Sequence, residues 1–175
     1  TSAELLDGPP LDPVSVPPWS IVRYEHPSRG EKPPVTLTWY HGKGQRPKIL
    51  TDAQYQQWKS GVLFLGEKGQ LISNYANHEL WPEEQFREFV RPKPTIKNSI
   101  GHHKEWLEAI KGNGKPTCHF DYAGPLSETA LLGNVAFRTR KKLAWDWKKM
   151  EATNCPEARQ FVQHKYRQGW ETALT

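Results

Sequence analysis

Apolar and polar residues alternate along two stretches near the start of the chain, at 21–26 and 35–40. In the second stretch Val35, Leu37 and Trp39 fall on one side, and the residues between them fall on the other. Successive side chains of a strand point to opposite faces, so this period of two predicts two strands. The segment between them contains Pro and Gly, and we therefore expect a turn that joins the two strands.

A second pair of apolar runs lies at 61–65 and 70–73, on either side of the glycine-rich sequence 66–69. Two short apolar runs around such a turn are typical of a β-hairpin. We expect the sheet to grow by local antiparallel pairing of this kind.

The segment from Ser99 to Lys111 has the spacing of an amphipathic helix. Its apolar side follows the order i, i+3, i+4, i+7 and consists of His103, Trp106, Leu107 and Ile110. Ser99 can cap the first turn, and a glycine follows the last one. The pattern predicts a helix with one buried face.

Three further elements follow. Pro125 suits the first position of a helix, and apolar residues continue this helix to about Arg138. The sequence at 142–145 predicts a short strand. Pro156 then opens a last helix that we expect to end near Gly169.

The order of these elements favours an α+β fold, with a mostly antiparallel open sheet and helices packed on one face. The other face of the sheet must then be covered by something else. Residues 1–19 are rich in proline, which resists helix and strand alike, so they are interpreted as an arm or connector. Residues 20–175 are interpreted as one α/β domain.

The composition is that of a globular protein, with 36% hydrophobic and 25% charged residues. The formal net charge is +5, but the basic residues are scattered, so a nucleic-acid partner is not expected. No apolar run approaches the roughly 20 residues that cross a bilayer, so no membrane partner is expected. Residues 1–20 lack the regions of a signal peptide, and the compartment is left undetermined.

The two cysteines, Cys118 and Cys155, do not form a C-x-x-C pair and are interpreted as structural thiols, with a disulfide as the less favoured alternative. A dinucleotide site requires a G-x-G-x-x-G turn between a strand and a helix, and the sequence contains none. We therefore expect no cofactor site in this chain.

His102 and His103 are the first candidates for substrate binding. Adjacent helical residues point about 100° apart, so the two rings are poorly placed to share a metal ion, and no metal site is expected. His103 is interpreted mainly as a packing residue. His102 could donate a hydrogen bond to a sugar or a carboxylate in a cleft.

Asn74, Tyr75 and Trp81 are further candidates for substrate binding, because they follow the hairpin and loops at sheet ends often carry function. His119 and Asp121 could serve acid–base chemistry, although the same residue types form turns and caps. Of the eight tryptophans, periodicity assigns Trp39, Trp106 and Trp145 to the core and leaves Trp58 and Trp81 freer to stack on a sugar.

Several segments together resemble the bacterial Gfo/Idh/MocA oxidoreductases, in particular the planctomycete-type branch. They are Arg29–Tyr40, Ser99–Trp106, Phe120–Glu128, Leu132–Ala136, Lys141–Asp146, Ala152–Glu157 and Tyr166–Trp170. The resemblance covers most residues from about 20 to 170.

In that family an N-terminal Rossmann domain binds NAD or NADP, and a C-terminal α/β domain supplies the substrate side and the oligomer contact. The chain resembles only the second domain. The resemblance thus implies part of an enzyme that acts on a sugar-like or polyol-like hydroxyl and is inactive alone, with no catalytic residue in this chain and a homo-oligomer formed through the open sheet face. It does not separate a dehydrogenase from an NAD-dependent glycosidase.

Glu31, Lys32 and Pro33 spell the catalytic tripeptide of the family, but there the motif belongs at the end of the Rossmann domain. Here it leads into a strand, so it is interpreted as a chance match. Arg140 stands where the family commonly has a small residue such as Gly. The alternative from another class is a noncatalytic carbohydrate-binding or assembly domain.

Overall fold

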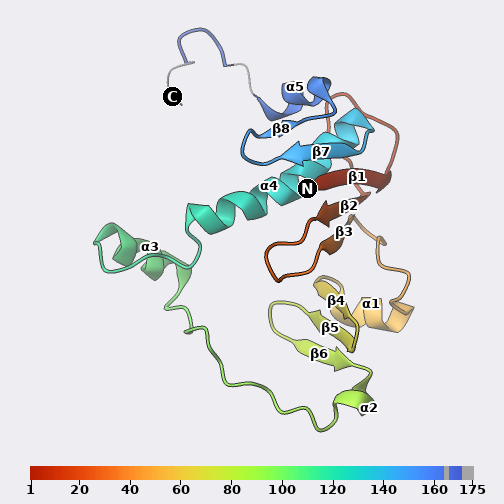
Figure 1. Cartoon of the computed structure of the whole chain (residues 1–175), viewed down its shortest axis with the longest axis vertical. Helices are drawn as coiled ribbons and strands as arrows, with labels where there is room; N and C mark the ends of the chain where they lie inside the picture. Colours follow the sequence, from red (N-terminus) through yellow and green to blue (C-terminus); the bar gives the residue numbers. More distant parts are fainter. Residues whose placement is uncertain (164–165, 171–175) are drawn as a thin grey trace. The chain divides into compact units, whose positions relative to one another are not determined.

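The computed structural model describes residues 1–163 and 166–170, and its contacts divide the chain into two compact units. The larger unit combines residues 1–45 with the C-terminal part from 116 onward, and the smaller one is the inserted segment 46–115. Figure 1 shows an antiparallel sheet with helices in each unit. The predicted α+β class is confirmed.

The larger unit contains a five-stranded antiparallel sheet in the order β3-β2-β1-β7-β8. Its strands are β1 (Ser2–Asp7), β2 (Ser20–His26), β3 (Val35–His41), β7 (Leu143–Asp146) and β8 (Glu151–Ala152). The strands predicted at 21–26, 35–40 and 142–145 are confirmed as β2, β3 and β7.

The expectation that residues 1–19 form no strand is wrong for residues 2–7. They form β1, the central strand, which pairs with β2 on one side and β7 on the other. The prolines begin only at Pro9, and the earlier Ala3 and Leu5 present a short apolar face to the core. Proline thus excludes regular structure after β1 but not in it.

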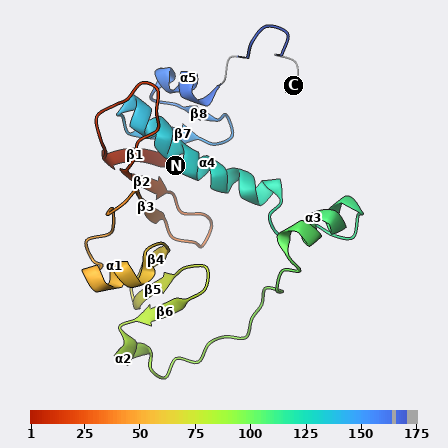
Figure 2. The same cartoon turned by 180° about the vertical axis from the view of Figure 1, so that it is seen from behind.

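One helix, α4 (Phe120–Thr139), packs over β1 and β2 of this sheet (Figures 1 and 2). A Cβ atom at Gly133 would lie well within 3.0 Å of the Tyr24 hydroxyl oxygen, so this glycine permits the close approach of helix and sheet. The helix begins five residues before the predicted start at Pro125, which lies inside it.

Arg140 ends α4 with φ 55° and ψ 25°, in the left-handed region where glycine is usual. Its guanidinium group stacks on the Phe137 ring and donates a hydrogen bond to the Pro9 carbonyl oxygen. These contacts explain how a residue other than glycine is held in this conformation.

The opposite face of the larger sheet, called the open face below, is polar. It carries Ser2, Glu4, Arg23, Glu25 and Ala144, since these residues lie directly opposite one another across β7, β1 and β2. Arg23 forms an ion pair with Glu4 at 2.6 Å, and Lys142 forms one with Glu25 at 2.7 Å. In the described part of the larger unit, α4 packs on the opposite, apolar face, in agreement with the predicted helix-covered face.

The last helix is much shorter than predicted. Pro156–Ala158 form a 3₁₀ turn, and α5 (Arg159–Val162) ends where Gln163 becomes extended. Part of the predicted helix, at 164–165, lies outside the described residues. A proline start and an apolar stripe do not by themselves sustain a helix without further packing surface.

The smaller unit contains a three-stranded antiparallel sheet in the order β4-β5-β6. Its elements are α1 (Asp52–Trp58), β4 (Val62–Gly66), β5 (Gly69–Ser73), β6 (His78–Trp81), α2 (Glu83–Phe86) and α3 (His102–Ile110). The predicted hairpin is confirmed as β4 and β5. The third strand and α1 were not predicted, although Thr51 and Gln54 form a capping box at the start of α1.

Burial corrects three of the tryptophan predictions. Trp145 lies in the core at 7% exposure, as predicted, but Trp39 and Trp106 are exposed at 45% and 61%. Trp58, expected to be free, is buried at 6% exposure.

Cys118 and Cys155 are both free thiols, the first exposed and the second buried. No helix among the described residues is long and apolar enough to cross a membrane.

Candidate functional site

Two regions are candidates for function: the five residues predicted to bind substrate, which lie in the smaller unit, and a groove in the larger unit. The first of these two regions includes the N-terminus of α3. Gly101 stands before this helix with φ 99° and ψ 133° and makes no side-chain cap. Ser99, the predicted cap, accepts a hydrogen bond from the Gly101 amide at 3.0 Å and donates one to Glu105 at 2.5 Å.

His102 and His103 form the first turn of α3, and their ring centroids lie 4.2 Å apart with planes inclined by 46°. Both side chains are exposed, so the prediction that His103 packs in a core is wrong. Within residues 1–163 and 166–170, no cluster of three His, Cys, Asp or Glu residues could hold a metal ion. The pair is available as two adjacent imidazoles that can donate or accept hydrogen bonds.

The apolar side of α3 is also exposed. Trp106, Leu107 and Ile110 retain 61%, 49% and 66% of their accessible surface. The helical period is as predicted, but the predicted burial of this face is wrong for the described part of the chain. The result is an apolar helix face that continues from the histidine pair, and it is called the α3 stripe below.

Asn74 and Tyr75 lie in the turn between β5 and β6, and Trp81 lies at the opposite end of β6, across from Gln70. The Asn74 side chain accepts hydrogen bonds from the amides of Ala76 and Asn77 at 2.9 and 2.8 Å, which closes the turn between β5 and β6. Tyr75 projects fully into solvent at the tip of this turn. Asn74 is thus explained by turn formation, and Tyr75 remains exposed.

Trp81 ends β6 and is half-buried, and its indole Nε1 donates a hydrogen bond to Glu79 at 3.2 Å. Among the described residues no hydrogen bond or ring contact joins Trp81, Asn74 or Tyr75 to the histidine pair. The five predicted residues therefore belong to one unit without forming one assembled site.

His119 and Asp121, considered for acid–base chemistry, lie at the start of α4. The carbonyl oxygen of His119 accepts hydrogen bonds from the amides of Tyr122 and Ala123, both at 2.9 Å. His119 Nδ1 lies 3.5 Å from Asp121 Oδ2. The arrangement is that of a helix start, which supports the turn-and-cap interpretation of these residues.

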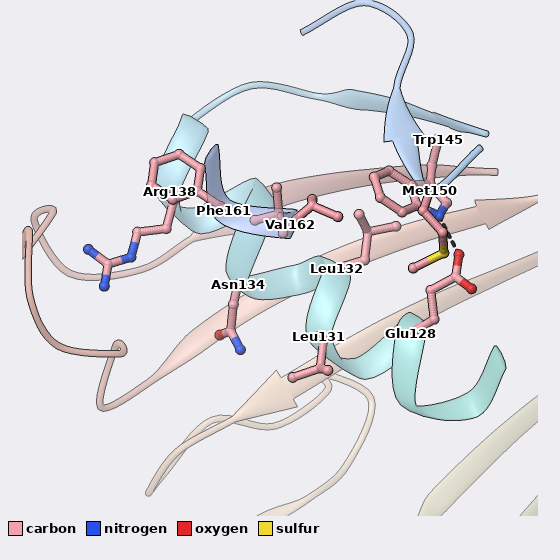
Figure 3. A pocket seen from close by; sticks show the side chains of 10 residues that line it. Glu128, Leu131, Leu132, Asn134, Arg138, Trp145, Met150, Phe161 and Val162 are labelled. Atoms are coloured by element: carbon pink, nitrogen blue, oxygen red, sulfur yellow. Dashed lines mark hydrogen bonds between the residues drawn. The ribbon is translucent and has the colours of Figure 1, made fainter. Parts of the chain in front are cut away.

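The groove in the larger unit was not predicted from the sequence. It has a volume of about 440 Å³ and runs along α4 beside α5 and the β7–β8 connection (Figure 3). Its lining residues are Glu128, Leu131, Leu132, Asn134, Val135, Arg138, Trp145, Met150, Phe161 and Val162. A volume of this size and a mainly apolar wall are usual for small-molecule sites.

The charged residues of the groove are already engaged. Glu128 accepts a hydrogen bond from the Trp145 indole, as Figure 3 shows. Arg138 donates to the carbonyl oxygens of Asp12, Val14 and Ser15 at 2.7, 3.1 and 3.1 Å. The side chains that line the groove thus supply an apolar binding surface and no pair of groups placed for proton transfer.

Cys155 lies in the hydrophobic core of the larger unit. The pKa values of Cys155 and of nearby Glu157 are shifted from their ordinary values. Burial raises the pKa of the Cys155 thiol above its ordinary value. The Lys141 ammonium group lowers the pKa of Glu157 to about 2. A buried thiol with a raised pKa is a poor nucleophile, so the interpretation of Cys155 as structural agrees with its surroundings.

Lys32 of the Glu31-Lys32-Pro33 tripeptide lies in the turn between β2 and β3. Its amide donates to the Arg29 carbonyl oxygen at 3.1 Å, and the Arg29 amide donates back at 3.0 Å. Gly30 adopts φ 57° inside this tight turn. The tripeptide is therefore part of an exposed hairpin connection. It lies about 70 positions before the candidate residues of α3 along the chain.

No family model, no curated protein and no solved structure matches this chain.

Proposed function

We propose that this chain is the substrate-side and oligomerisation portion of an NAD(P)-dependent oxidoreductase of the Gfo/Idh/MocA type, acting on the hydroxyl of a sugar or polyol. The observation that carries the proposal is the arrangement at α3. The segment Ser99–Trp106, which resembles that family, places two adjacent imidazoles beside the exposed α3 stripe. Imidazoles suit hydrogen bonds to substrate hydroxyl groups, and the apolar stripe suits contact with another protein domain.

The cofactor belongs to another part of the enzyme in this proposal. Dinucleotide crevices form at the carboxyl ends of parallel strands, next to a glycine-rich turn. The described sheets of this chain are antiparallel, and the sequence lacks that turn, which supports placing the cofactor in another domain. We therefore assign hydride transfer to the cofactor-bearing domain and substrate orientation to this chain.

The oligomer contact is assigned to the open face of the larger sheet. Arg23 on β2 forms an ion pair with Glu4 on β1 across this face, and α4 of the larger unit packs on the other face of the sheet. Polar and charged groups of this kind can set the register between two copies.

The first test is a titration of the purified chain with NADH and NADPH, followed by cofactor and tryptophan fluorescence. We expect no saturable binding. Saturable binding at micromolar cofactor would contradict the assignment of the cofactor to another domain.

A second test uses the complete enzyme, in which this sequence is joined to its nucleotide-binding domain. We expect His102→Ala to lower kcat/KM by about 10-fold, as loss of a hydrogen bond to substrate does. His78→Ala is the matched control, because His78 is an exposed histidine on β6. An unaltered kcat/KM in His102→Ala would remove this residue from the substrate side.

The second candidate function is a noncatalytic carbohydrate-binding domain. It is favoured by the exposed indoles of Trp106 and Trp147, each at 61% exposure, because indole faces pack on sugar rings. A sugar-dependent change in tryptophan fluorescence that Trp106→Ala or Trp147→Ala abolishes, without any cofactor-dependent activity of the complete enzyme, would favour this candidate over the oxidoreductase.

A further inference from the structure

Within the larger unit, no strand pairs with the outer side of the edge strand β3. All seven residues from Val35 to His41 pair with β2 in unbroken register. Among the described residues no other backbone hydrogen bond involves this strand. The N–H and C=O groups on its outer side are therefore ready to pair with another strand.

Natural sheet edges usually carry a charge, a proline or a bulge that prevents such pairing. The strand β3 has none of these between Val35 and Tyr40, and its prolines precede it. By contrast, the other edge strand, β8, has only two residues. The β3 edge is thus the longer and more regular edge of this sheet.

Within the larger unit, the side chains of β3 also leave apolar surface uncovered next to this edge. Val35 and Trp39 are 53% and 45% exposed on the side of the sheet where α4 packs. Leu37, between them, is partly buried against the core. A strand added at this edge would extend the sheet and cover the same apolar surface.

We propose that β3 pairs with β3 of a second copy of this chain, antiparallel about a two-fold axis at Thr38, so that two sheets join into one. A two-fold axis at this residue pairs all seven residues of the strand, whereas each one-residue shift of the axis loses two pairs. Leu37 of one copy then lies opposite Trp39 of the other, twice. Such aliphatic–aromatic pairs across antiparallel strands are stabilising.

This contact differs from the open-face contact of the proposed function and does not depend on that function. An edge contact uses the backbone of β3, whereas an open-face contact uses side chains such as those of Ala144 and Glu4 on β7 and β1. The two contacts can therefore be tested separately.

The test uses Thr38→Cys in a Cys118→Ser background, which removes the exposed native thiol. In the proposed dimer the two introduced cysteines lie directly opposite, at a Cα separation of about 4.5 to 5.5 Å that permits a disulfide. Thr36→Cys in the same background is the matched control, because it lies on the same strand and face but about 14 Å from its counterpart. We expect mild oxidation to cross-link the Thr38→Cys variant rapidly and the control at least 10-fold more slowly.

Sedimentation equilibrium gives an independent readout that does not depend on a new cysteine. Ala144→Lys in the Cys118→Ser background places a charge on the open face and disfavours the open-face contact, so we expect this protein to be a dimer through β3. Ala144→Lys should also leave the cross-link of the Thr38→Cys variant unchanged. A monomer, or equal cross-linking at positions 36 and 38, would overturn the proposal. Loss of the dimer and of the cross-link in Ala144→Lys would assign the association to the open face and likewise overturn edge pairing.

Discussion

The guanidinium group of Arg138 lies 2.7 Å from the carbonyl oxygen of Asp12, a residue 126 positions earlier in the chain. The same group also holds the carbonyl oxygens of Val14 and Ser15. One side chain at the end of α4 thus orders the proline-rich connection between β1 and β2.

Arg138→Ala should lower the free energy of unfolding by about 2 kcal/mol, because hydrogen bonds from a charged donor contribute about 1.5 to 3 kcal/mol. Urea denaturation followed by tryptophan fluorescence measures the change. Arg91→Ala is the control, since Arg91 is exposed and has no hydrogen bond among the described residues. Equal stability of the two variants would show that Arg138 does not order the connection.

Gly133→Ala should destabilise the protein by about 1 to 3 kcal/mol, the usual cost of overpacking a core. The new methyl group would lie well within 3.0 Å of the Tyr24 hydroxyl oxygen. Thermal denaturation followed by circular dichroism measures the effect. Asn134→Ala is the control, because this exposed neighbour on α4 lacks that contact. If overpacking is the cause, adding Tyr24→Phe to Gly133→Ala should recover part of the loss.

The protein should lose the stability that ionised Glu157 contributes as the pH falls from about 4.5 to about 2. Its pKa is lowered to about 2 in the folded state by the Lys141 ammonium group, from an ordinary value of 4.5. A lowered folded pKa contributes stability that is present above 4.5 and is lost as the pH falls through the folded pKa. Glu157→Gln should therefore flatten the acid side of a plot of stability against pH. The exposed Glu67→Gln is the control, and an identical acid slope in both variants would contradict the prediction.

Trp106→Ala should change the stability of the isolated chain by less than about 0.5 kcal/mol, as is usual for exposed positions. Trp145→Ala should cost about 3 to 5 kcal/mol, because Trp145 is buried in the core of the larger unit. Denaturant titration of both variants compares an exposed with a buried indole. A loss of several kcal/mol in Trp106→Ala would show that the α3 stripe is covered in the isolated chain.

The positions of β2, β3, β4 and β5 could be predicted because local patterns determine them. Alternation with period two and the glycine turn between the last two strands need no information from distant residues. The strand β6 was missed because His78 and Glu79 interrupt its apolar pattern, and it pairs with β5 through the backbone. Backbone pairing leaves little trace in such a short polar sequence.

The candidate functional residues also divide into features that a local sequence pattern predicts and features that depend on distant contacts. Periodicity predicted α3 and its apolar side, but it could not predict that Trp106 would stay exposed, because burial depends on what packs against the helix. The groove along α4 was missed for a related reason. Its walls come from α4, from Trp145 and Met150, and from Phe161 on α5, which become neighbours only when the chain folds.

By itself, the sequence determined the α+β class, the antiparallel hairpins, the helical period of α3 and the absence of a dinucleotide motif, because each depends on residues near one another in the chain. Tertiary structure alone decided that residues 2–7 become the central strand, that Trp58 is buried while Trp39 and Trp106 are exposed, and that a groove lies beside α4. These features depend on contacts between distant segments, and the hydrophobic effect that drives such contacts is not directional. Their partners therefore cannot be inferred from a local pattern.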